Sequence, residues 1–287
     1  MIMEFLLMLL VVALYTVCSL NDKYAVSRCK MSGSRLTFLM AAGTAFFMAF
    51  TLPFTDTYIT LSWQSALAIL LIVLSKMLEF QMAGKILVTM SAFELKAWNG
   101  VVLFLSYLSD VLLGEEVKLL RILCIALTAL GLVFIATAGK KKVNYREIAL
   151  WLILYILGKF LYGVVMQQCT PYISSQMTLF IALVLLAVIL IPAAKPMKIV
   201  GDCAEGRKGI IIILLCKLPN VFGLYGENKL CETSLANWAF ITPMILVVMF
   251  IAELIKPEEG ERPGKLSLLG SVICILGVIG FQWAAAV

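Results

Sequence analysis

Long apolar segments separated by short polar ones run through the whole chain. A bilayer core needs about 20 consecutive apolar residues per helix, and ten segments of suitable length and hydropathy can be marked off. They are residues 3–22, 36–55, 62–83, 91–113, 117–138, 147–167, 176–193, 209–226, 234–255 and 266–286. The connections between them leave no room for a separate soluble domain. The pattern predicts an all-α integral membrane protein with ten transmembrane helices.

Composition supports this prediction. Hydrophobic residues make up 62% of the 287 residues and charged residues only 14%, against roughly a quarter in average soluble proteins. A soluble domain of this length has too little interior to hide so much apolar surface, so lipid must cover the excess. The first apolar segment lacks a basic start and a small-residue cleavage site, so we expect a retained helix and a multi-pass protein of a bacterial plasma (inner) membrane.

The residue types behind most catalysis and metal binding are scarce. The chain has no histidine, the commonest general base and metal ligand, and its eight cysteines form no CxxC motif. No Walker motif for ATP is present. We therefore expect no enzyme activity, no cofactor and no bound metal. The net charge of +6 lies in short loops, which argues against a nucleic-acid partner.

The basic residues of the loops suggest an orientation. Odd-numbered loops between the predicted helices hold sixteen Lys and Arg residues, whereas even-numbered loops hold three. The positive-inside rule then places the odd-numbered loops in the cytoplasm and both termini outside.

The two halves of the chain follow one plan. Gly131 and Gly277 lie 146 residues apart at the same point of the fifth and tenth segments, and Glu115 and Glu261 precede them at the same spacing. Five helices per half is an odd number, so the second half must be inserted upside down relative to the first.

The first and sixth segments match as well, with Tyr15 aligned to Tyr155. The chain is therefore predicted to consist of two inverted five-helix repeats, residues 1–140 and residues 141–287.

One stretch at residues 112–142 resembles the end of an EamA-type repeat of the drug/metabolite transporter superfamily: LLGEEVKLLRILCIALTALGLVFIATAGKKK. Such repeats close with a Leu-Gly-Glu turn and a helix that carries a late Leu-Gly. The second half is similar over its length, including Thr242-Pro243, although PEEGE replaces its Leu-Gly-Glu. The resemblance implies a ten-helix carrier of amino acids, nucleotide-linked sugars, choline or other metabolites. Nucleotide-sugar relatives have both termini in the cytoplasm, so the orientation stays open.

Polar side chains within the predicted helices are the candidate substrate-binding residues. A charge at the bilayer centre costs roughly 2.5–3.5 kcal/mol, so such residues usually face a cavity or a partner. Lys159 shares a helix stripe with Tyr155 and Tyr162, where it could bind an anionic or carboxylate-bearing solute or, alternatively, reach the membrane surface. Lys217 and Asn220 lie beside a proline that interrupts the eighth segment, a feature of transporter sites or of a simple kink.

The third and fourth segments add further candidates. Lys96, Asn99 and Tyr107 share a stripe that is predicted to line the same cavity. Lys76 and Glu79 stand three residues apart, which favours a structural ion pair. Glu79 is nevertheless the best candidate for a carboxylate that couples transport to a proton.

Together these features predict a secondary active transporter that works by alternating access. Its substrates would be small polar metabolites such as amino acids or related anionic or zwitterionic solutes. Efflux is expected rather than uptake, coupled to a proton or a counter-substrate, with membrane lipid as the other partner. The alternative is a non-transporting membrane scaffold or a component of a lipid-modification or flippase complex, which would give no solute flux.

Overall fold

The computed structural model describes residues 2–31, 33–90, 95, 98–137, 145–233, 235–255 and 264–286. These residues are helical along almost their whole length, and none of them forms a strand. The all-α fold class predicted from the apolar segments is confirmed.

Eleven helices of ten residues or more carry the fold of this part of the chain. They are α1 (Ile2–Ser27), α2 (Gly33–Thr51), α3 (Trp63–Thr89), α5 (Val101–Leu112), α6 (Leu119–Thr137), α7 (Tyr145–Cys169), α8 (Ser175–Ala194), α10 (Gly206–Leu215), α11 (Lys217–Thr233), α13 (Ile241–Ile255) and α14 (Lys265–Ala286). Four short pieces join them: η1 (Leu52–Phe54), η2 (Pro196–Lys198), α9 (Ile199–Asp202) and α12 (Leu235–Ala239).

Six helical stretches of the described chain are long and apolar enough to cross a membrane. They are Leu6–Ser27, Gly33–Phe54, Trp63–Thr89, Tyr145–Cys169, Ser175–Ala194 and Gly206–Thr233. Three further apolar helices, over Val101–Leu112, Leu119–Ile135 and Lys265–Phe281, are shorter. The protein therefore has the helices of a membrane protein, whereas the count of ten spans stays a prediction.

The outward-facing side chains fit a lipid environment. Phe50, Leu150 and Trp283 are each more than 60% exposed, and many other large apolar side chains are similarly uncovered. Exposed apolar surface of this extent would cause a soluble monomer to aggregate, but it is the normal outer face of a membrane protein.

The helix predicted over residues 209–226 is interrupted at Cys216, three residues before Pro219. Helix α10 ends at Leu215 and α11 begins at Lys217, so Pro219 lies in the first turn of α11. A proline is tolerated there because the amides of a first helical turn have no partner within the helix. The interruption places the buried Lys217 at a helix start.

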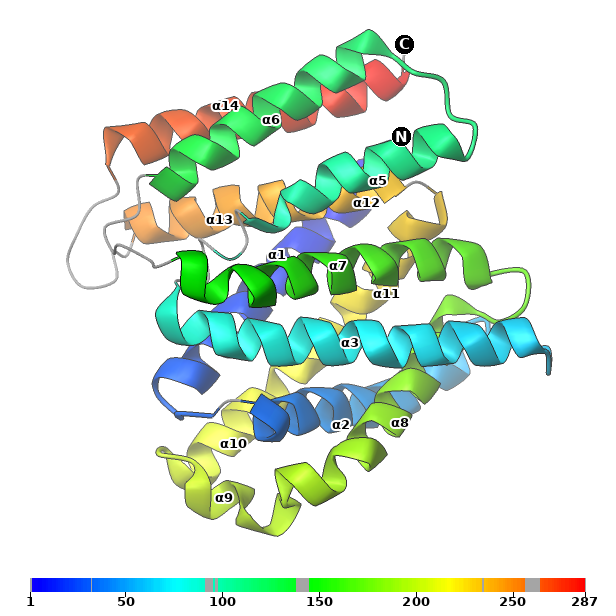
Figure 1. Cartoon of the computed structure of the whole chain (residues 1–287), viewed down its shortest axis with the longest axis vertical. Coiled ribbons are helices and arrows are strands. Elements are labelled where there is room, and N and C mark those ends of the chain that lie inside the picture. The colour runs from blue at the N-terminus through cyan, green and yellow to red at the C-terminus, as the bar shows by residue number, and fades with distance from the viewer. Residues whose placement is uncertain are drawn as a thin grey trace.

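The helices pack in pairs that join distant parts of the chain. Helix α6 packs along α14, α2 along α8, α3 along α7 and α1 along α11. In Figure 1, α6 and α14 lie side by side at one edge of the bundle. Helix α1 ends on the left of that view and α7 ends on the right, so the two run in opposite directions.

Small residues allow α6 and α14 to approach closely. A Cβ atom on Gly131 would lie 2.7 Å from the backbone nitrogen of Cys274 and 2.7 Å from the carbonyl oxygen of Gly270. A Cβ atom on Gly277 would lie 2.9 Å from the carbonyl oxygen of Cys124. The two backbones are therefore in direct contact, as small residues permit in membrane helix pairs.

We predict that Gly131→Ala and Gly277→Ala each destabilise the protein by about 1–3 kcal/mol, because a methyl group would push two backbones apart. The matched control is Gly201→Ala in α9, where a Cβ atom would meet nothing within 4 Å. Chemical unfolding of the detergent-solubilised protein, followed by circular dichroism, measures the difference. Equal stability of all three variants would contradict the close contact.

Candidate functional site

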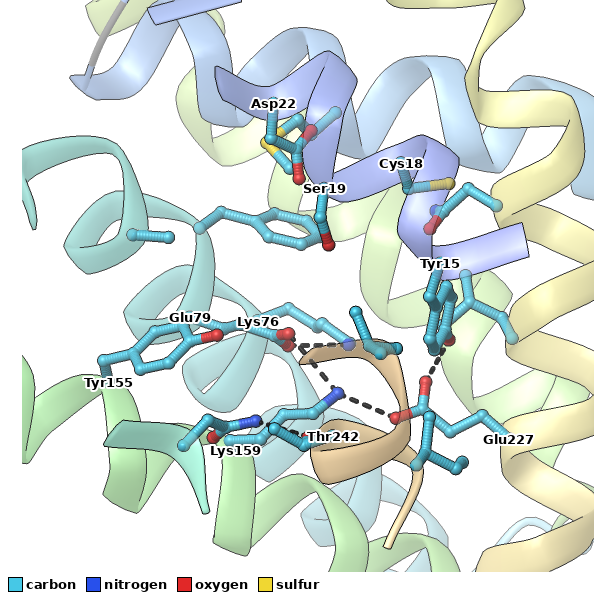
Figure 2. A pocket seen from close by; sticks show the side chains of 18 of the residues that line it. Tyr15, Cys18, Ser19, Asp22, Lys76, Glu79, Tyr155, Lys159, Glu227 and Thr242 are labelled. Carbon is cyan, nitrogen blue, oxygen red and sulfur yellow. Dashed lines mark hydrogen bonds and ion pairs between the residues drawn. The ribbon is translucent and has the colours of Figure 1, made fainter. Parts of the chain in front are cut away.

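A cavity of about 100 Å³ lies between the helices, large enough for several water molecules. Helices α1, α3, α7 and α11 line it together with residues around α12 and α13, and Figure 2 shows its labelled side chains. Its polar lining residues are Tyr15, Ser19, Asp22, Thr44, Lys76, Glu79, Asn99, Tyr155, Lys159, Lys217, Asn220, Glu227, Trp238 and Thr242.

Lys159 stands at the centre of a buried charge network. Its Nζ lies 2.7 Å from Glu227 Oε1 and 3.5 Å from Glu79 Oε1. Glu227 is almost fully buried and also accepts hydrogen bonds from Tyr15 and from the indole of Trp238, the latter at 2.8 Å. Lys159 of α7 is therefore held between carboxylates of α3 and α11 (Figure 2).

Lys76 forms the structural ion pair that its spacing predicted. Its Nζ lies 2.8 Å from Glu79 Oε2, and it also stands 3.8 Å from the centre of the Tyr162 ring, a cation–π contact. Glu79 therefore lies between two lysines, Lys76 and Lys159.

Lys217 and Asn220 of α11 also line the cavity. The Nζ of Lys217 lies 3.2 Å from Asp22 Oδ1, which joins α11 to the last part of α1. The amide of Asn220 donates to Thr44 of α2 at 3.2 Å. Near the middle of the bundle, Asn99 donates to Thr242 at 2.9 Å.

The described lining is balanced in charge. Each of its lysines, Lys76, Lys159 and Lys217, lies within 3.5 Å of a carboxylate, and three carboxylates, Asp22, Glu79 and Glu227, serve them. Pairing reduces the cost of holding these groups away from water, because each charge has a partner of opposite sign nearby. Among the described residues, no group of three or more cysteine or acidic side chains is arranged to hold a metal.

Most of the residues singled out from the sequence meet at this cavity. Tyr155, Lys159, Lys217, Asn220 and Asn99 line it, although they come from separate predicted segments. Glu79, the candidate coupling carboxylate, lines it as well. Lys96 lies outside the described residues.

Two predicted lining residues lie elsewhere. Tyr162 is fully buried behind Lys76, with its hydroxyl bonded to Asn228. Tyr107 faces α14, where it packs edge-on against Phe281 and accepts a hydrogen bond from the amide of Lys118. Helical periodicity correctly placed each tyrosine on the same helix face as the cavity residues. It could not show that this face contacts a different element one or two turns further along the helix.

Sequence reasoning missed two carboxylates because they fall at the ends of predicted segments. The first segment was predicted to end at Asp22, yet α1 continues to Ser27; the eighth was predicted to end one residue before Glu227, yet α11 continues to Thr233. Polar residues late in a helix lower the local hydropathy and so shorten the predicted span. The need for charge pairing could have identified them, because lysines within a membrane require acidic partners.

Comparison with protein-family models finds no match for this chain, and comparison with curated proteins finds none either.

The Lys159–Glu227 pair gives a test of the network. We predict that Lys159→Met destabilises the protein by about 3–5 kcal/mol, because it leaves the buried Glu227 without its closest partner. Glu227→Met should cost less, because Lys159 keeps Glu79 at 3.5 Å. The double variant should recover most of that loss, since Lys76 and Glu79 still pair. Unfolding in detergent provides the measurement, with Lys229→Gln at the exposed Lys229–Glu232 pair as the nearly neutral control. A double variant less stable than either single one would refute the pairing.

Proposed function

We propose that this protein is a membrane carrier that moves small, net-neutral polar solutes by alternating access through the cavity. Zwitterions of amino-acid type are the solute class that fits best. The proposal depends chiefly on one observation: three lysines and three carboxylates of the described chain converge on a space between helices.

Intramembrane charges are costly and are rarely retained for stability, since apolar side chains of similar volume often serve as well or better. Charges gathered around a polar space mark a solute pathway more often than a packing solution. The balance of charge also bears on the substrate. The lysines taken alone favoured an anionic solute, but their carboxylate partners remove that preference.

A zwitterion suits this lining because it brings no net charge into a buried space. Its ammonium would compete with Lys159 for Glu227, beside the aromatic side chains of Tyr15 and Trp238. Its carboxylate would interact with a lysine released from its partner. Lys159 can shift toward Glu79, already 3.5 Å away, so exchange of partners requires only a small movement.

We propose further that the chain forms two inverted five-helix repeats and crosses the membrane ten times. Contacts between α6 and α14 support this, because they are reciprocal. Gly131 meets the backbone nitrogen of Cys274, while Gly277 meets that of Thr128. The offset in residue number from Gly131 to Gly277 equals the offset from Thr128 to Cys274, so exchanging the halves converts the first contact into the second.

Reciprocal contacts also occur around the cavity. Cys18 Sγ lies 3.7 Å from the carbonyl oxygen of Cys216, while a Cβ atom on Gly158 would lie 3.1 Å from that of Ser75. The offset in residue number from Cys18 to Gly158 matches the offset from Ser75 to Cys216 to within one position. An approximate two-fold axis between the repeats accounts for both contacts.

The loops at the two ends of the bundle make reciprocal contacts of the same kind. The amide of Ala204 donates to the carbonyl of Cys29 at 3.0 Å, and the amide of Thr60 donates to the carbonyl of Tyr172 at 2.8 Å. The number of residues between the two acceptors, Cys29 and Tyr172, matches the number between the two donors, Thr60 and Ala204, to within one position. Both numbers are larger than the offsets around the cavity and smaller than the offset between α6 and α14.

The family and the setting follow as proposals. The resemblance to EamA-type repeats, efflux across a plasma membrane and coupling to a proton through Glu79 all suit a two-fold carrier with a charged central cavity. A scaffold or a flippase component would have no need of such a cavity for solutes.

Transport by purified protein in proteoliposomes tests the proposal. We expect uptake or exchange of radiolabelled zwitterionic amino acids, with dicarboxylates and diamines as comparison solutes. The Lys159→Met/Glu227→Met double variant should keep its fold and lose about tenfold or more of the rate, because both substrate-facing charges are gone; about 1.4 kcal/mol is enough for that factor. Lys229→Gln serves as the control, and wild-type-like flux in the double variant would refute the site.

Glu79→Gln gives a separate test of coupling. We predict that this variant loses the response of transport to an imposed pH gradient while it retains exchange of labelled for unlabelled solute, because an amide cannot release a proton. Flux is measured with and without the gradient in the same vesicles. An unchanged response would assign the coupling elsewhere.

A further inference from the structure

We propose that the Lys217–Asp22 ion pair and the Lys76–Tyr162 cation–π contact are the two closures of the cavity, one at each end. This inference rests on the proposed carrier function. It assigns a specific role to Tyr162, which does not line the cavity, and to Lys76, which otherwise serves as a structural partner of Glu79.

The two contacts occupy equivalent places in the two halves. Lys76 and Lys217 lie in the matching stretches Ser75-Lys76 and Cys216-Lys217. The offset from Asp22 to Tyr162 is the same as the offset from Cys18 to Gly158, which relates the reciprocal contacts around the cavity. Lys217 therefore meets Asp22 as Lys76 meets Tyr162.

The contacts lie on opposite sides of the cavity centre. Along α1, Asp22 lies beyond Tyr15 toward the loop that joins α1 to α2, which we call the α1–α2 end. Along α7, Tyr162 lies beyond Lys159 toward the loop that joins α7 to α8, the α7–α8 end. Because α1 and α7 run in opposite directions (Figure 1), these ends are opposite faces of the bundle.

The lining residues occupy one side of the Lys76–Tyr162 contact. Those from α7 precede Tyr162, and those from α3 run from Lys76 toward the α1–α2 end as far as Leu87. The Asp22 side chain is 26% exposed, whereas Tyr162 is completely buried. The α7–α8 closure is thus shut, and the α1–α2 closure is the looser of the two.

The chemistry of the closures differs in a useful way. At the α1–α2 end a lysine meets a carboxylate, and at the α7–α8 end it meets an aromatic ring. Lys76 already has Glu79 as a second partner at 2.8 Å, so it can leave the ring of Tyr162 without losing its counter-charge. Opening the α7–α8 end then separates Lys76 from Tyr162, while Lys217 and Asp22 draw together to shut the other.

Two native cysteines report on the two ends. Cys18 lines the cavity at 5% exposure, and Cys231 is fully buried in the last part of α11. The next residue, Glu232, accepts a hydrogen bond from Ser175 at the start of α8, so Cys231 lies toward the α7–α8 end. The rate at which N-ethylmaleimide alkylates each thiol measures how accessible that end of the cavity is. Mass spectrometry of the purified protein in proteoliposomes gives both rates in one sample.

We expect Tyr162→Leu to raise the Cys231 rate and lower the Cys18 rate, and Asp22→Asn to do the reverse, each by about fivefold or more. The decisive measurement in each variant is the rate of the cysteine far from the substitution. This is Cys18 in Tyr162→Leu and Cys231 in Asp22→Asn, because the substituted residue does not contact the thiol in either case. Tyr162→Phe keeps the ring and Asp22→Glu keeps the charge, so both should behave as the parent protein does.

Matched controls are Tyr172→Leu and Asp202→Asn, two exposed positions away from the cavity, where both rates should stay unchanged. If either closure variant raises both rates, the substitution has loosened the fold, and the assignment is wrong. Unchanged distant rates overturn it too. If the two alkylation rates shift in opposite directions but the protein transports no solute, the assignment of the closures stands and the carrier function is refuted instead.

Discussion

The need to compensate charge inside a low-dielectric bundle organises this protein. A lysine placed within an apolar helix must meet a carboxylate, and here the partners come from other helices: Lys159 of α7 lies between Glu79 of α3 and Glu227 of α11. Lys217 of α11 meets Asp22 of α1 in the same way. Each pair constrains how its helices are placed, because displacing one would leave a charge without its partner.

The same pairing shapes the chemistry of the cavity. A described lining in which lysines and carboxylates are equal in number has no net charge to attract an ion strongly, yet it holds many groups that a polar solute can engage. Because Lys159 has two carboxylates within 3.5 Å, a solute can displace it from one without leaving it unpaired. A network of this kind favours exchange of partners over permanent tight binding.

Around the charged centre, the fold combines rigid contacts with an interrupted helix. The backbones of α6 and α14 touch at Gly131 and Gly277, which fixes the close spacing of this helix pair. Helix α11 begins at Lys217, directly after α10, and its first turn holds Pro219. Contacts that recur at a nearly constant offset along the chain are the pattern expected if the chain forms the two inverted repeats proposed above.

The sequence alone determined that this is a helical membrane protein, because hydropathy and helix length depend only on local composition, and it identified the intramembrane lysines. It did not determine which carboxylates Lys159 and Lys217 meet, since those partners lie 68 residues away for Lys159 and 195 for Lys217. Helical periodicity specifies the face on which a residue lies, but only tertiary packing decides what that face contacts. For that reason Tyr107 and Tyr162 were misplaced, while Asp22 and Glu227 went unnoticed until the bundle brought them together.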